Sequence, residues 1–291
     1  MPLYGKQGWE QYLQLWFLFV HRQNYGPLLY NQDFPYQFYL EPEVVFNGMN
    51  YLGSNDLIQD RAPTVLKRTD RRIGISLGVP IGSKYKSSIG IKAINNVDRY
   101  GNNDIFISTD TLDELHLTGY KSGFEISRNN LNRKQYASEG GAFSLTANYF
   151  NVIEDYSSGN TSLQSQKIRN AHQWLRAKFS AEQYFRLGWF SLGYNVEGVL
   201  SNQPFFQNYL GTIINAPAFL PLQDSRTLVL ENFRAFNYAA AGIRNVISIR
   251  KRLDLRLEGY LFKPFDYLQK GPDQKTTSTT DLRNIFFAST V

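Results

Sequence analysis

The stretch RRIGISLGVPIGSKYKSSIGIKA, residues 71–93, alternates apolar and polar side chains through two segments that flank a short connection at 81–83. Alternation with a period of two is typical of β-strands whose two faces meet different surroundings. The stretch therefore predicts two strands, at 71–80 and 84–93, each apolar on one face and polar on the other. The apolar face carries Ile73, Ile75, Leu77 and Val79 in the first segment and Tyr85, Ile89, Ile91 and Ala93 in the second.

The same alternation recurs along the chain, and the connections between the segments alternate between long and short. Further strands are predicted at 239–249 and 253–261 and, from noisier patterns, at 9–21, 35–49, 116–128, 140–153, 172–186 and 189–201. Long connections are expected at 50–69, 99–114, 154–170, 202–235 and 265–282, tight ones at 81–83, 187–189 and 250–252, and intermediate ones at 22–34 and 129–139. Tight turns at one end and long loops at the other are typical of transmembrane β-barrels.

Segment length favours a membrane barrel over a soluble sandwich. The segments run about 10 to 14 residues, whereas roughly 9 to 11 cross a bilayer at a tilt and strands of globular proteins are usually about 5 to 6. A sheet in hydrocarbon must pair every backbone group and so closes on itself. We therefore predict an all-β fold, an antiparallel up-and-down transmembrane β-barrel, with its apolar face outward and its charged face inward.

Composition narrows the functional classes further. The 291-residue chain is 42% hydrophobic and 15% aromatic and has no cysteine, so we expect no disulfide framework and no thiolate metal site. The three histidines, His21, His116 and His172, have no ligand spacing, and we predict neither a metal nor a cofactor. The formal net charge is +6, but the cations alternate with other residues rather than clustering beside aromatics, which argues against nucleic acid. The run YLQLWFLFV is too short for a spanning helix.

Three details qualify this prediction. Pro42 lies inside a predicted strand, where it lacks a ladder donor, and we expect a bulge there. The segment DLRNIFFASTV at 281–291 begins a strand for which no closing partner follows, so the barrel is expected to be incomplete. Several aromatic residues near segment ends suit interfacial girdles or, alternatively, core packing: Trp9, Tyr36, Tyr149, Trp174, Trp189 and Tyr194.

Residues 74–78, GISLG, match the G-x-S-x-G pattern of a serine-hydrolase nucleophile. That pattern works where a strand leads into the serine and a helix follows it. After Gly78 the chain carries Pro80 and Gly82 and no helical periodicity. Ser76 is therefore interpreted as an inward-facing strand residue, and no catalytic residue is predicted.

Three longer stretches suggest a family: SRNNLNRKQYASEGGAFSLTANYF at 127–150, EDYSSGNTS at 154–162 and, most specifically, residues 194–246. They resemble the C-terminal barrel of patatin-like phospholipases of Bacteroidetes outer membranes, within the bacterial surface antigen superfamily. The resemblance implies a barrel of sixteen strands preceded by periplasmic domains. On that basis residues 1–291 form one partial barrel domain of about ten to eleven strands, truncated at both ends.

The resemblance also implies a structural motif in the longest loop, at about 202–235, which would fold back into the lumen. Family members carry an Arg-Gly-aromatic motif there, and the matching residues are Phe233, Arg234, Ala235 and Phe236. Ala235 stands where the family has glycine, which puts the tight backbone geometry in doubt. A guanidinium removed from bulk water needs a partner. The candidate partners are Glu258 first and Glu197 second.

The expected function is a non-catalytic barrel in the outer membrane of a Gram-negative bacterium. By the resemblance, it would anchor or export a patatin-like phospholipase domain that this chain lacks. Its expected partners are outer-membrane lipid and its own N-terminal patatin and periplasmic domains. The alternatives are an outer-membrane assembly or translocation barrel, a serine hydrolase that uses Ser76, and a soluble all-β binding protein.

Overall fold

The computed structural model describes residues 38–53, 66–102, 109–133, 137–221, 228–250, 253–280 and 283–290. Ten strands follow one another in an antiparallel sheet. They are β1 (Tyr39–Gly53), β2 (Leu66–Ile81), β3 (Tyr85–Tyr100), β4 (Asp113–Asn129), β5 (Gly140–Ser157), β6 (Lys167–Leu187), β7 (Phe190–Ser201), β9 (Tyr238–Arg250), β10 (Leu253–Pro264) and β13 (Phe286–Thr290). The connection between β7 and β9 holds helix α1 (Tyr209–Asn215), strand β8 (Leu228–Val229) and a 3-10 helix (Glu231–Phe233).

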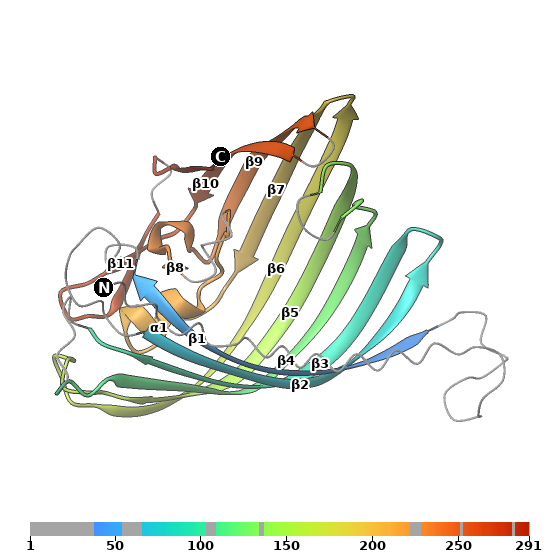
Figure 1. Cartoon of the computed structure of the whole chain (residues 1–291). Helices are drawn as coiled ribbons and strands as arrows, with labels where there is room; N and C mark the ends of the chain where they lie inside the picture. The colour runs from blue at the N-terminus through green and yellow to red at the C-terminus, as the bar shows by residue number, and fades with distance from the viewer. Residues whose placement is uncertain are drawn as a thin grey trace.

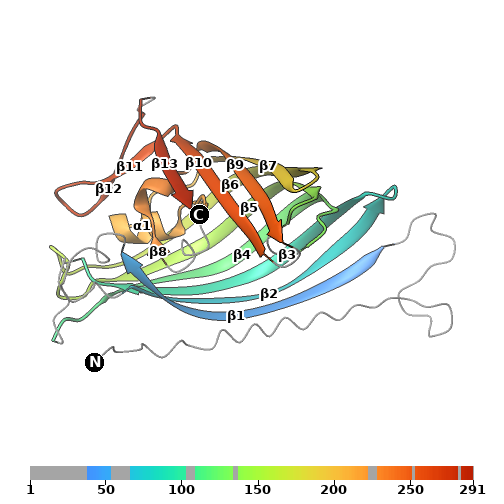
Figure 2. The ribbon, with the colours of Figure 1, turned by 45° about the horizontal axis from the view of Figure 1, so that its top comes forward.

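The sheet order is β13-β10-β9-β7-β6-β5-β4-β3-β2-β1-β8, and β8 pairs in parallel with the end of β1. The ribbon curls into an open trough, with α1 on its concave side (Figures 1 and 2). Within the described residues β1 pairs with neither β10 nor β13, so this part of the chain forms an incomplete barrel. The predicted up-and-down β fold of about ten to eleven strands is confirmed.

The two faces of the sheet carry the expected side chains. On the outer, convex face, Ile75 is 44% exposed, Ile91 50% and Leu255 38%. On the inner face the side chains of Lys92 and Arg256 are only 23% and 16% exposed, and both form ion pairs. Apolar side chains thus line the outside of the trough, and charged ones line the inside.

At the long-loop end this pattern reverses. Leu115 and Leu117 of β4 are buried on the inner face, while their neighbours Glu114 and His116 point outward. Leu66 of β2 is likewise buried inside. The strands consequently extend further toward the long loops than predicted. The reason is that the inner face there packs against the connection between β7 and β9 and needs apolar residues.

Several local predictions are corrected. The register of β1 against β2 runs without a shift through Pro42, so the predicted bulge is wrong. At Pro42, β1 pairs with β2 on one side and has no described neighbour on the other, so it is an edge strand there. An edge strand tolerates a proline, which lacks the N–H group of the ladder. The connection at 265–282 contains an unpredicted hairpin, β11 (Tyr267–Lys270) and β12 (Thr276–Thr279), because its TTST strand lacks apolar alternation. The strand expected at 9–21 lies outside the described residues.

The aromatic residues divide between the two faces. Tyr194 is 43% exposed on the outer face, and Trp189, 68% exposed, lies in the tight turn between β6 and β7. Trp174 instead faces inward, where it stacks on Phe150 with ring centroids 4.6 Å apart and is covered by Phe206. For Trp174 the core-packing alternative therefore holds, and Trp9 and Tyr36 lie outside the described residues.

Inward-facing glycines make room for aromatic rings. A Cβ atom on Gly242 would lie 2.4 Å from the ring of Tyr260, whereas a Cβ on the outward-facing Gly259 would meet nothing closer than 3.8 Å. Gly242→Ala should therefore lower the free energy of unfolding by about 1 to 3 kcal/mol through overpacking. Gly259→Ala is the matched control and should leave stability unchanged or slightly higher. Urea unfolding of both variants, followed by tryptophan fluorescence, checks this, and equal midpoints would contradict the packing described.

Candidate functional site

The connection between β7 and β9, residues 202–237, is here called the inner loop; its described parts are 202–221 and 228–237. It lies on the inner face of the sheet (Figure 2). Its apolar side chains share one buried cluster with strand residues. The cluster contains Phe206, Tyr209, Ile213, Ile214, Ala216, Val229 and Phe236 from the inner loop and Leu66, Ile94, Tyr100, Leu115, Leu117, Phe150, Val152, Tyr156 and Trp174 from β2 to β6.

Asn208 fixes the start of α1 to the sheet. Its side-chain oxygen accepts hydrogen bonds from Gly211 N at 2.8 Å, as an N-cap does, and from the Tyr100 hydroxyl at 2.7 Å. Its amide nitrogen donates to Asp113 at 3.1 Å. One buried side chain therefore both begins the helix and joins it to β3 and β4.

Asp113 is a fully buried carboxylate that gathers several segments around it. Besides Asn208, it accepts hydrogen bonds from Asn102 Nδ2, Ser162 Oγ and Tyr156 Oη, each at 2.6 Å, and from Gly159 N at 2.7 Å. These donors compensate the loss of water around the charge. The carboxylate thereby ties the inner loop to the connections on either side of the β4–β5 pair.

Two arginines close the other end of α1. Arg234 Nη1 donates to the carbonyl oxygens of Ile213 at 3.1 Å and Ile214 at 2.8 Å. Arg68 of β2 also donates to Ile214 O, at 3.2 Å. The last carbonyls of a helix lack partners within the helix and carry partial negative charge, so cations there are stabilising.

Asn215, the last residue of α1, continues this contact with the strands. It donates to Asp98 Oδ2 at 2.8 Å and accepts from Arg68 Nη2 at 3.0 Å. Its carbonyl accepts from Gln203 Nε2 at 3.3 Å, and Gln203 in turn accepts from Arg176 of β6. The end of α1 is thus bound to β2, β3 and β6.

Two further carboxylates hold the inner loop: the buried Glu154 joins it to the sheet, and the exposed Glu231 makes a contact within the loop. Glu154 of β5 accepts a hydrogen bond from Gln207 N at 2.8 Å and pairs with His172 Nε2 at 2.6 Å. On α1, burial raises the pKa of Tyr209 far above its ordinary value, and the nearby Glu231 carboxylate raises that pKa further. The phenol therefore stays protonated and donates to Glu231 Oε2 at 2.8 Å.

The predicted partners of Arg234 have other contacts. Glu258 accepts hydrogen bonds from Arg256, at 3.0 and 2.9 Å, and from the Tyr260 hydroxyl at 2.7 Å. Glu197 pairs with Lys178 at 2.9 Å and accepts from the Tyr238 hydroxyl. The described hydrogen bonds of Arg234 go instead to backbone carbonyls within its own loop, which a search for carboxylates on neighbouring strands overlooks.

The other motif residues lie where the inner loop rejoins the sheet. Phe233, Ala235 and Phe236 are buried, and Ala235 N donates to Pro217 O at 3.2 Å. Gln274 is the one non-glycine residue with positive φ in the described part of the chain, so Ala235 does not use the left-handed region. The alanine therefore fits this backbone without strain.

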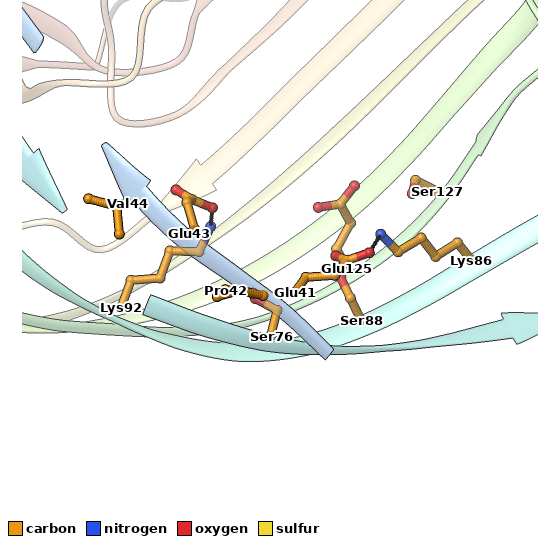
Figure 3. Close-up of a pocket in the computed structure, with 10 residues that line it drawn as sticks. All are labelled: Glu41, Pro42, Glu43, Val44, Ser76, Lys86, Ser88, Lys92, Glu125 and Ser127. Carbon is orange, nitrogen blue, oxygen red and sulfur yellow. Dashed lines mark hydrogen bonds and ion pairs between the residues drawn. The ribbon is translucent and has the colours of Figure 1, made fainter. Parts of the chain in front are cut away.

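Ser76 lies elsewhere, in a polar pocket of about 240 Å³ on the inner face near β1 (Figure 3). The pocket holds two ion pairs, Glu41 with Lys86 and Glu43 with Lys92. Ser76 is in the middle of β2, which leads through a tight turn into β3. His172 is four strands away in the sheet order. The strand–turn–helix context of a nucleophile is therefore missing around this serine.

Searches of family models and of curated proteins found no match to this chain. Within the described residues no three His, Asp or Glu side chains converge as metal ligands would, and no helix there is both long and apolar enough to cross a membrane.

The attachment of α1 by Arg234 can be tested directly. Hydrogen bonds to charged groups contribute about 1.5 to 3 kcal/mol, so Arg234→Met should speed hydrogen exchange at residues 209–215 by about ten- to a hundredfold. Arg169→Met removes an outer-face arginine whose ion pair with Asp155 spans 3.6 Å, and it serves as the control. Hydrogen–deuterium exchange with mass spectrometry measures both. Equal protection of α1 in the two variants would show that Arg234 does not hold the helix.

Proposed function

We propose that this chain is part of an outer-membrane β-barrel of a Gram-negative bacterium. The observation that carries the proposal is the sorting of side chains between the faces of the sheet. Ile73, Ile75 and Ile91 are exposed outside, while Lys92 and Arg256 are paired inside. A soluble protein would bury the first set, whereas a barrel in lipid turns it outward.

Strand length and the ends of the sheet support the same proposal. Most of the long strands exceed the roughly 9 to 11 residues needed to cross a bilayer, with 16 residues in β2 and 18 in β5. The extra length lies at the long-loop end, where outward-facing residues become polar, as with Lys67, Arg99 and Glu114. The apolar part of the outer face is therefore a band that ends before the long loops.

Within this class we propose the non-catalytic barrel of a patatin-like phospholipase, which anchors or exports the catalytic domain. The support is the family resemblance, most specific over residues 194–246, together with an inner loop that lies against the sheet as that resemblance implied. A serine hydrolase working through Ser76 is less well supported, because no hydrogen bond activates the hydroxyl among the described contacts. The nearby carboxylates of Glu41 and Glu43 are instead paired with Lys86 and Lys92.

An assembly or translocation barrel is the second candidate, because the same superfamily includes assembly factors and the charged inner face would suit a polar passenger. The gene sequence upstream of Met1 separates the two. A patatin domain encoded there supports the anchor, whereas several periplasmic repeats without one support the assembly barrel.

The membrane proposal predicts a contrast between two positions on β3. An arginine facing lipid at the bilayer midplane costs about 2 to 4 kcal/mol, so Ile91→Arg should reduce the amount of intact gene product in the outer-membrane fraction. Ser88→Arg places the same charge in the inner pocket beside Glu41 and Glu125 and should be tolerated. Cell fractionation with immunoblotting measures both. A detergent-free soluble protein that accepts both changes would instead be a soluble β binding protein.

The hydrolase alternative has its own test. Ser76→Ala in the intact gene product should leave esterase and phospholipase activity unchanged, because the hydroxyl has no described activating partner. Assays with a short-chain ester and with phospholipid vesicles measure this. Loss of activity in a correctly folded Ser76→Ala protein would assign the nucleophile to this chain.

A further inference from the structure

Strands β1, β2 and β3 keep all their described carboxylates on the inner face of the sheet, where cations pair with them, whereas the outer face carries cations alone. Among the side chains described there, the carboxylates all lie on the inner face: Glu41, Glu43, Asp70 and Asp98. The charged groups on the outer face are Lys67, Arg71 and Arg99, all of them cations. We call these three residues the rim patch.

The rim patch brings like charges together. Lys67 stands directly opposite Arg99 in the register of β2 and β3. Opposed like charges on one face of a sheet are destabilising unless something neutralises them. Glu114 accepts hydrogen bonds from Arg99 at 3.1 and 3.3 Å, while Lys67 has no ion-pair partner among the described residues. The patch therefore keeps a surplus of positive charge.

Within the rim patch, Arg71 lies nearest to the apolar band of the outer face. It lies four residues after Lys67 on the same face, and its guanidinium is 5.2 Å from the centre of the Phe46 ring. The next outward residues along β2 are Ile73 and Ile75, which are exposed. Moving along β2 from the long-loop end, the outer face thus presents cations first and then a wide apolar surface.

That order matches a phosphorylated lipid, whose anionic headgroup lies above its acyl chains. Arginine forms paired hydrogen bonds with phosphate oxygens, and lysine adds a further charge. On the same face the hydroxyl of Thr69 lies between Lys67 and Arg71, and the amide of Asn95 lies opposite Arg71; both can donate as well. The pairing of charge and apolarity fits a lipid better than a free anion.

We propose that the rim patch binds the phosphate of an anionic membrane lipid whose acyl chains lie on Ile73, Ile75 and Ile91. This site rests on the proposed membrane location, and it adds the chemical class of a bound partner. The long-loop end of the barrel would thereby be held at the headgroup layer on this side.

The test uses the intact gene product in phosphatidylcholine nanodiscs that contain a small fraction of diphosphorylated lipid A as the probe. Native mass spectrometry measures the bound probe. Lys67→Gln, Arg71→Gln and Arg99→Gln together should weaken binding about a hundredfold, since each cation near a lipid surface contributes about fivefold. Lys84→Gln, Arg128→Gln and Arg186→Gln make the same charge change at the tight-turn end and should leave binding unchanged.

Other outcomes would overturn the site. Equal loss in the two triple variants would indicate bulk charge, and undiminished binding in the first would exclude the rim patch. Equal binding of dephosphorylated lipid A would show that the rim patch does not recognise the phosphate. Full competition by inorganic phosphate would show that it binds a free anion rather than a lipid. Failure of the unaltered protein to enter any bilayer is a separate result, because it would refute the proposed membrane location itself.

Discussion

The register of the long strands is the constraint on which the other features depend. Because side chains alternate across a strand, a slip of one residue between neighbours would move a whole row to the opposite face. In β2 and β3 sixteen consecutive pairs hold Ile75 opposite Ile91 and Gly74 opposite Lys92. The glycine matters, because a Cβ at position 74 would come within 2.6 Å of the Lys92 side chain. Small inward residues thus let long charged ones lie across the sheet and reach their partners.

The inner loop depends on this sorting but reverses it locally. Where the loop rests, the inner face is apolar, and polar groups of α1 are placed where strand side chains satisfy them. Asn208 and Asn215 mark the two ends of the helix, and each is bound to a carboxylate, Asp113 or Asp98. A short helix of this kind is unstable alone, so the sheet supplies most of what keeps it folded. The loop and the sheet therefore form one structure.

The sequence alone indicated the strands, their order and their two faces, because alternation is a local property that each segment carries. The prediction failed where an inward-facing residue packs against a segment that is distant in the sequence. Leu115 and Leu117 broke the expected pattern because the inner loop packs against them, and Trp174 faces inward because Phe206 of the same loop covers it. Asn208 just before an apolar run is an N-cap signal that the alternation pattern alone does not reveal. The contacts of Arg234 with Ile213 and Ile214 could not be predicted, because a backbone carbonyl has no identity in sequence.

The short parallel pairing of β8 with the end of β1 has a consequence for how the chain assembles. Leu228 and Val229 follow β7 in sequence, yet they bond to Leu52 and Gly53 at the opposite side of the sheet. Closing so long a segment of chain carries a large entropic cost before any contact rewards it. The pairing of β8 with β1 should therefore form after the hairpins between neighbouring strands have formed. Once formed, this pairing joins the inner loop to the edge of the sheet and so limits how far the curved sheet can flatten.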